Sequence, residues 1–152
     1  MAQSIFTTTL VYCLPLFGGC SKFEIQDLQV LQNKLVQMIT RLPPRSNRNM
    51  MFDKVKWLTV NQLIVYHTLV TVYKIRQNIE PELLANKLRN DSRNGRIIIP
   101  NMKLRLVQKS FCIRGAANWN ELPENLRTQQ NIKTFKTEVQ KWITSNIPRF
   151  LD

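Results

Sequence analysis

The sequence predicts a mainly α-helical fold, an irregular helical bundle with a basic extended or loop segment and at most a minor β element. Two capping boxes, followed by apolar residues at helical spacing, indicate helices, and proline and glycine pairs mark the breaks between them. A chain of 152 residues fits one ordinary domain, and its 43% apolar content is sufficient for a hydrophobic core.

The strongest predicted helix runs from Ser21 to Leu42. Ser21 and Glu24 have the spacing of a capping box, in which two side chains accept hydrogen bonds from open backbone N–H groups at a helix start. Apolar residues then recur at steps of three and four: Ile25, Leu28, Leu31, Leu35, Met38, Ile39 and Leu42. We expect this amphipathic helix to display a neutral polar outer face made of Gln26, Gln29, Gln32, Asn33 and Gln37.

Two further helices are predicted after the proline pair at 43–44. Residues 50–57 form a short one, with Asn49 as its cap. Thr59 and Gln62 form a second capping box, and Leu63, Tyr66, Val70 and Tyr73 follow it at helical spacing. The many β-branched residues of this run favour a strand locally, but the cap and the length favour a helix.

The second half of the chain alternates short elements. Pro81 opens a short helix through about Leu88, and residues 96–100 form a short strand or extended segment. Residues 114–122 form a short helix that ends at Pro123. Asn131 caps a last helix with one apolar face: Ile132, Phe135, Val139, Trp142 and Ile143.

The N-terminal residues 4–17 could form a strand or a short buried helix. This apolar run precedes Gly18, Gly19 and Cys20, as a secretory or lipoprotein signal would, but the first 21 residues contain no Lys or Arg, and the run is too short to span a bilayer. We therefore expect an intracellular protein, nuclear or cytoplasmic, without a membrane partner. A secreted or lipid-anchored protein, cleaved before Cys20, is the alternative.

Positive charge dominates, with 22 Lys and Arg against 10 Asp and Glu, a net charge of +12. Such a balance favours a polyanionic partner, most commonly nucleic acid. Asp91 is the one acid among the eight basic residues of the segment 87–114: Lys87, Arg89, Arg93, Arg96, Lys103, Arg105, Lys109 and Arg114. We interpret these as contacts to backbone phosphates, independent of base sequence, with Arg45 and Arg48 as secondary contacts. A solvated loop with incidental charge is the alternative.

The aromatic residues near this segment have two interpretations. Phe111 and Trp119 could stack on exposed bases, but such residues more often anchor a small core, and we favour that role. Gly115 could relax the backbone so that Arg114 approaches a phosphate, or could simply mark a turn.

Catalytic chemistry is not indicated. The acids are scattered rather than clustered as a metal-dependent nuclease or polymerase needs, and no Gly-rich phosphate loop or nucleophile elbow is present. His67 lies in an apolar helical pattern and is expected to be a packing residue. Cys13, Cys20 and Cys112 have neither disulfide-framework nor zinc-ligand spacing. We expect no enzyme activity, no cofactor and no metal.

Several short motifs, in order along nearly the whole chain, resemble one protein family. The segments that carry the resemblance are Val11–Gly18, Leu28–Lys34, Trp57–Val60, Tyr73–Ile75, Pro81–Leu84, Leu126–Arg127 and Phe135–Lys136. Ser110-Phe111, Arg114-Gly115, Trp119-Asn120 and Leu122-Pro123 resemble a signature near the end of those proteins. The family is that of the jockey-like non-LTR retrotransposon reverse transcriptases.

The resemblance implies a division of the chain and a role. Residues 1–20 would be a residual core segment from the junction of polymerase palm and thumb, 21–89 a thumb-like helical region, and 90–152 a basic segment with a C-terminal helical tail. In the family these parts help to hold the template–primer duplex and element RNA. The family's catalytic carboxylates, its endonuclease and the Cys/His knuckle of some relatives have no counterpart in this sequence, so the resemblance implies a non-catalytic fragment that binds RNA, RNA–DNA or DNA duplexes.

A second hypothesis is a small helical protein-interaction or structural protein, or a non-functional truncated copy of the element. If Met1 truncates a larger domain, residues 5–17 and the apolar face from Leu28 to Leu42 would lack their cover and drive self-association.

Overall fold

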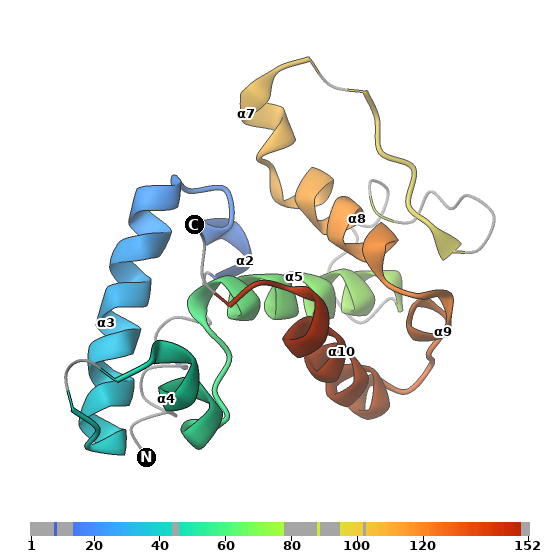
Figure 1. Ribbon diagram of the computed structural model, residues 1–152. Helices are drawn as coiled ribbons and strands as arrows, with labels where there is room; N and C mark the ends of the chain where they lie inside the picture. The colour runs from blue at the N-terminus through green and yellow to red at the C-terminus, as the bar shows by residue number, and fades with distance from the viewer. Residues whose placement is uncertain are drawn as a thin grey trace.

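The structure, a computed structural model, describes residues 8, 14–43, 46–77, 88, 95–101 and 103–149. It is mainly helical, which confirms the predicted fold class (Figure 1). The helices are α2 (Leu14–Phe17), α3 (Lys22–Thr40), α4 (Arg48–Val55), α5 (Val60–Arg76), α7 (Arg105–Gln108), α8 (Phe111–Glu121), α9 (Glu124–Arg127) and α10 (Ile132–Asn146). Residues 96–100 are not helical, and Ile97 alone among them is in a β-bridge, so the β content of the described residues is minor as expected.

Helix α5 lies in the middle of the molecule, and α2, α3, α8 and α10 all pack against it (Figure 1). The predicted capping box is present at its start, with Thr59 accepting from the Gln62 backbone and Gln62 accepting from the Thr59 backbone. Its β-branched residues are buried in tertiary contacts that outweigh their strand propensity. The chain is therefore organised around one buried helix.

In the described part of the chain, buried residues form three clusters. The largest lies between the second half of α5, α8, α9 and α10, where the rings of Tyr73 and Phe135 stack with centroids 4.2 Å apart and Trp119 lies 5.9 Å from Phe135. A second cluster joins Leu14 of α2 to the start of α5. A third joins α3 to α4 around Phe52.

Helix α3 begins at the predicted capping box but buries a different face from the expected one. Gln32 is 1% exposed, whereas Leu31 and Met38 are 55% and 77% exposed. Hydrogen bonds to the backbone near the start of α5 explain this orientation. Gln32 donates to the carbonyl of Leu58 at 2.8 Å, and Gln29 accepts from the N–H of Val60 at 2.9 Å.

These two glutamines satisfy backbone groups at and just before the start of α5, where a helix leaves its N–H groups without partners. They also bond to each other at 2.9 Å. The predicted outer polar face is thus wrong for Gln29 and Gln32, and part of the predicted apolar face lies in solvent.

The remaining boundaries follow the predictions with small shifts. Asn47 rather than Asn49 caps α4, accepting from the Asn49 N–H at 2.9 Å, and α8 begins at Phe111, three residues earlier than expected. Asn131 caps α10 as predicted. The expected helix at 81–88 lies outside the described residues except for Leu88, which is buried.

The glutamine contact between α3 and α5 makes a stability prediction. Replacing Gln32 by Ala leaves the Leu58 carbonyl without its donor, and we expect the free energy of unfolding to fall by about 1–3 kcal/mol. Gln26→Ala, on the exposed side of the same helix, should change it by less than about 0.5 kcal/mol. Urea unfolding followed by circular dichroism measures both, and equal effects of the two substitutions would contradict the assignment.

Candidate nucleic-acid interface

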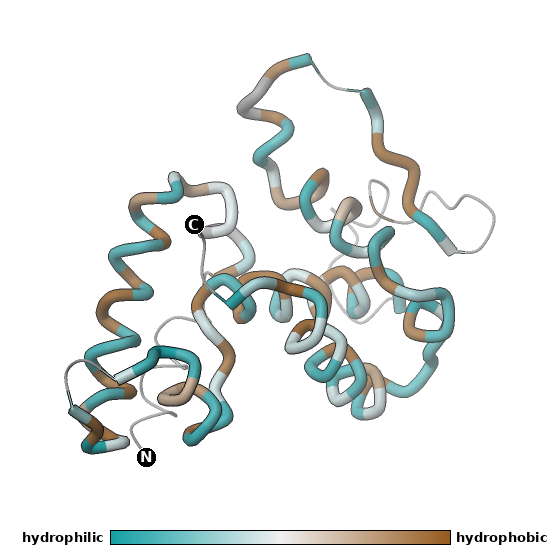
Figure 2. Tube along the Cα trace, in the orientation of Figure 1, coloured by the Kyte–Doolittle hydropathy of each residue, from teal (hydrophilic) through white to brown (hydrophobic). Residues whose placement is uncertain are grey.

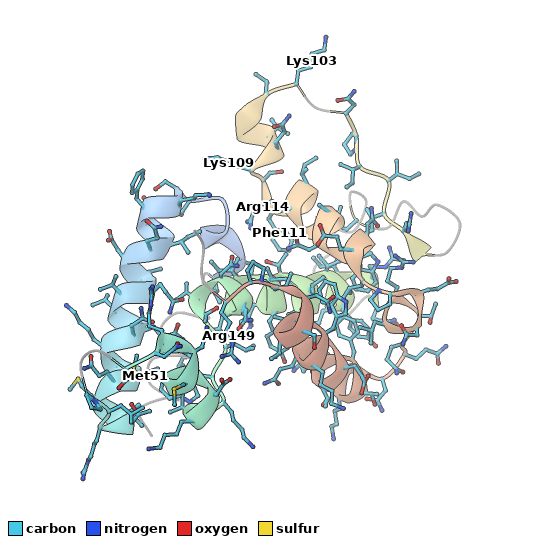
Figure 3. All side chains as sticks on the ribbon, viewed as in Figure 1. Met51, Lys103, Lys109, Phe111, Arg114 and Arg149 are labelled. Atoms are coloured by element: carbon cyan, nitrogen blue, oxygen red, sulfur yellow. The ribbon has the colours of Figure 1, made fainter. Side chains whose placement is uncertain are left out.

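A segment that we call the basic arm comprises residues 95–101 and 103–110. It leaves the helical body, turns through the short helix α7 and returns to α8 (Figure 1). Lys103 lies at its far end and Lys109 at its return, as Figure 3 shows, and both are exposed. Ile98, Ile99 and Leu104 are also exposed, at 56%, 40% and 71%, so the arm presents apolar as well as basic side chains (Figure 2).

The outgoing end of the arm is fixed to α8 by side chains of the Trp-Asn pair. The amide of Asn120 accepts from the N–H of Ile97 and donates to its carbonyl, both at 2.8 Å, as a neighbouring strand would. The indole N–H of Trp119 donates to the carbonyl of Gly95 at 3.0 Å. Gly95 has a φ of +67°, a left-handed conformation that glycine adopts readily.

The returning end is fixed by Arg114. Its Nε donates to the carbonyl of Lys109 at 3.0 Å, and Nη2 donates to the carbonyl of Pro15 at 2.7 Å (Figure 3). Burial lowers the pKa of this guanidinium from its usual value. Arg114 therefore joins the arm, α8 and α2, and the phosphate contact predicted for it competes with two internal hydrogen bonds.

Two glycines allow this packing. A Cβ at Gly18 would collide with the Arg114 guanidinium and lie 2.8 Å from Ile64, and a Cβ at Gly115 would lie 2.9 Å from Val72. Gly115 lies inside α8 and lets this helix approach α5, so neither the turn nor the phosphate role expected for it describes its position.

The structure brings together part of the predicted basic set. Arg96, Lys103 and Lys109 are exposed on the arm, and Arg105 begins α7. Lys87, Arg89, Arg93 and the secondary residue Arg45 lie outside the described residues. Arg48, the other secondary residue, is exposed at the start of α4, away from the arm.

The aromatic residues have the anchoring role that we favoured. Trp119 is 1% exposed, and Phe111 is partly buried against the main core. Arg76 lies 5.2 Å from the centroid of the Trp119 ring and donates to the carbonyl of Leu88 at 3.1 Å. Base stacking on Trp119 is excluded by its burial.

One carboxylate lies near the arm. Two hydrogen bonds from Ser21, and to a lesser extent the charge of Lys109, lower the pKa of Glu24 at the start of α3. Within the sequence of the arm and α8, residues 95–120 contain no Asp or Glu. The arm's own charge is therefore positive along its whole length.

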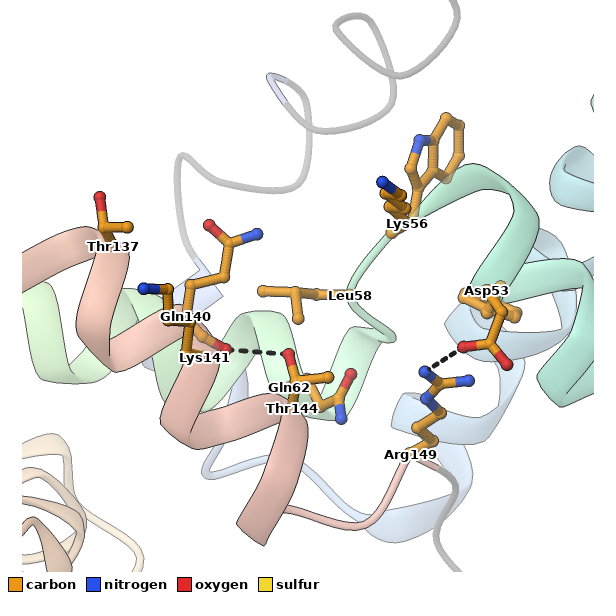
Figure 4. Close-up of a pocket in the computed structure, with 11 residues that line it drawn as sticks. Asp53, Lys56, Leu58, Gln62, Thr137, Gln140, Lys141, Thr144 and Arg149 are labelled. Carbon is orange, nitrogen blue, oxygen red and sulfur yellow. Dashed lines mark hydrogen bonds and ion pairs between the residues drawn. The ribbon is translucent and has the colours of Figure 1, made fainter.

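A second basic surface, which sequence patterns did not indicate, lines a cavity of about 440 Å³ between α4, the start of α5 and α10 (Figure 4). Lys56 and Lys141 lie on opposite sides of it, and Arg149 forms an ion pair with Asp53 at 2.5 Å. Lys141 also pairs with Glu138 at 3.4 Å. Residues so far apart in the chain share no spacing from which this site could be predicted.

His67 is partly buried on α5, as expected for a packing residue, with the ring of Tyr66 edge-on at 5.1 Å. Burial lowers its pKa, and the charges of Lys136 and Lys74 lower it further.

The described residues contain no group of three or more His, Cys, Asp and Glu side chains that could hold a metal ion. Cys20 and Cys112 are free thiols, and Cys13 lies outside the described part of the chain. None of the helices that the structure describes is long and apolar enough to cross a membrane.

Comparison with known proteins gives no match: no protein-family model, no curated protein and no solved structure is significantly similar to this chain.

The anchoring of the arm can be tested at Asn120. Replacing it by Ala removes both hydrogen bonds to Ile97, and we expect the free energy of unfolding to fall by about 1–2 kcal/mol. Hydrogen exchange at the Ile97 amide should become faster as the arm loosens. Asn118→Ala, in the same helix, is the matched control and should leave that exchange rate unchanged.

His67 predicts a dependence of stability on pH. Because its pKa in the folded state is below the ordinary value of 6.5, the unfolded chain binds more protons at mildly acidic pH, and protonation opposes folding. Stability should therefore be complete above about pH 6.5 and fall as the pH decreases below it. His67→Gln should remove this loss between pH 6.5 and the range where carboxylates titrate; urea midpoints across this range measure it.

Proposed function

We propose that this chain is a non-catalytic nucleic-acid-binding module that holds an RNA-containing duplex through its backbone phosphates. The observation that carries the proposal is the basic arm: a projecting segment without acids in its sequence, with Arg96, Lys103 and Lys109 exposed. Lys and Arg side chains form charge-assisted hydrogen bonds to phosphate oxygens and need no defined base sequence for this.

The way in which the arm is attached supports this proposal. Asn120 and Trp119 hold one end, Arg114 holds the other, and Lys103 and Lys109 are exposed between them. An anchored projection loses less conformational entropy on binding than a free chain would. Its exposed Ile98, Ile99 and Leu104 are suited to contact sugars and base faces.

The resemblance to the thumb and C-terminal tail of jockey-like reverse transcriptases fits the same role, and with it we propose an origin in a retrotransposon polymerase. Such a part contributes affinity for template–primer or element RNA, while catalysis belongs to another region of the polymerase. The residues that we propose to contact phosphates are Lys87, Arg89, Arg93, Arg96, Lys103, Arg105 and Lys109, with Arg114 as an anchoring residue that completes the run.

A protein-interaction role is the second candidate, because the outer face of α3 leaves Leu31, Met38 and Ile39 exposed at 55%, 77% and 42%. Exposed apolar residues that gather on one face mark interaction surfaces. This surface is separate from the arm.

The binding proposal is tested by titrating a labelled RNA–DNA duplex with the protein at several salt concentrations. The logarithm of affinity should fall linearly with the logarithm of salt concentration, with a slope of about −0.9 for each phosphate contact. Lys103→Gln with Lys109→Gln should make the slope shallower by roughly 1.8, since two contacts are removed.

The matched control removes the same charge from surfaces away from the arm. Lys54→Gln with Lys133→Gln changes two exposed lysines on α4 and α10 and should leave the slope close to that of the parent protein. An affinity that does not depend on salt concentration, or an equal decrease of the slope in both double variants, would contradict the assignment to the arm.

A further inference from the structure

We propose that the outer face of α3 pairs, antiparallel, with the same face of a second copy of this chain. We call this face the α3 seam; it comprises Leu28, Leu31, Leu35 and Met38. This inference does not depend on the nucleic-acid proposal.

The seam has the spacing of a coiled-coil stripe. Its residues are separated by three, four and three positions, the alternation that keeps one stripe of apolar residues facing a partner helix in a coiled coil. The face that α3 buries within its own chain is centred elsewhere, on Gln32, Val36 and Thr40. Among the seam residues, Leu28 is partly buried against the cluster of Leu14, Val60 and Ile64, and it borders both faces. The seam lies roughly a third of a turn around the helix from the buried face, which leaves room for a second helix.

Much of the seam is exposed to solvent. Leu31 and Met38 are 55% and 77% exposed, and the neighbouring Ile39 is 42% exposed. Leu35 is only partly buried. Figure 1 shows α3 at the outer edge of the molecule, so a partner helix can approach it without contact with α5 or α10. Apolar groups gathered in this way gain free energy when a partner removes them from water.

Charged residues beside the seam favour an antiparallel partner. In an antiparallel pair that places Leu31 against Leu35 of the other copy and Leu28 against Met38, the flanking positions bring Asp27 opposite Arg41. Two-fold symmetry makes this ion pair twice. It also places Lys34 opposite Lys34 of the other copy, a like-charge contact that the two ion pairs outnumber. In a parallel pair, Lys34 would instead lie opposite Ile39 of the other copy and would form no ion pair there. Asp27 and Arg41 are both exposed.

The pair should be weak. One helix of 19 residues is about 28 Å long, so the contact falls at the small end of stable protein interfaces. The net charge of +12 on each copy also opposes association, and salt screens it. We therefore expect a dissociation constant in the micromolar range, and tighter pairing at higher salt, the opposite of phosphate binding.

The experiment is sedimentation equilibrium on nuclease-treated protein from micromolar to near-millimolar concentration. The apparent mass should rise from 17.9 kDa towards twice that value. Leu31→Gln with Met38→Gln should weaken the pair about tenfold or more. Phe23→Gln is the matched control, since Phe23 is on the same helix and as exposed as Met38, at 77%, but lies off the seam.

The antiparallel direction has its own test. Asp27→Arg alone and Arg41→Asp alone should each weaken the pair, because each sets like charges opposite one another, and the double variant should restore it. Circular dichroism confirms that each variant is folded. A protein that stays monomeric at every concentration, a dimer unaffected by the seam variant, or a double variant weaker than both single ones would overturn the proposal.

Discussion

Burial of α5 against four other helices is the constraint on which the rest of the structure depends. A helix enclosed in this way must be apolar on several sides and must have its backbone ends satisfied by neighbours. The first demand explains its β-branched and aromatic composition, and the second explains why glutamines from α3 lie at its start. Helix α4 packs instead against α3, around Phe52.

Those glutamines show why the sequence predicted the helices better than their orientation. Capping boxes at Ser21 and Thr59 are local, so their residues alone predict where α3 and α5 begin. The buried side of α3 depends on two groups distant in the chain, the carbonyl of Leu58 and the N–H of Val60. The spacing of apolar residues in α3 does not indicate that these groups require hydrogen-bond partners. The apolar period of α3 therefore predicted a helix correctly but assigned its buried side wrongly.

In the candidate site, too, some features could be predicted from the sequence and others could not. Charge is a property of composition, so the basic run could be recognised without a structure, and Trp119 could be recognised as an anchor from its size. The internal use of Arg114 could not, because its partner Pro15 lies 99 residues away in the chain. Lys56, Lys141 and Arg149 likewise meet at one cavity only through the packing of α10 beside α4 and α5.

The two proposed surfaces have a geometric relation that follows from these contacts. Lys109 lies near enough to Glu24 to act on its pKa, so the arm returns to the body beside the first turn of α3. In an antiparallel pair of α3 helices the two first turns are at opposite ends, about 28 Å apart, a length of roughly eight base pairs of duplex. Two arms at that separation would contact one duplex at two places, and the second contact would then be intramolecular, with the gain in affinity that linked sites confer. If both proposals hold, weak self-association would in this way increase the affinity of the proposed module for nucleic acid.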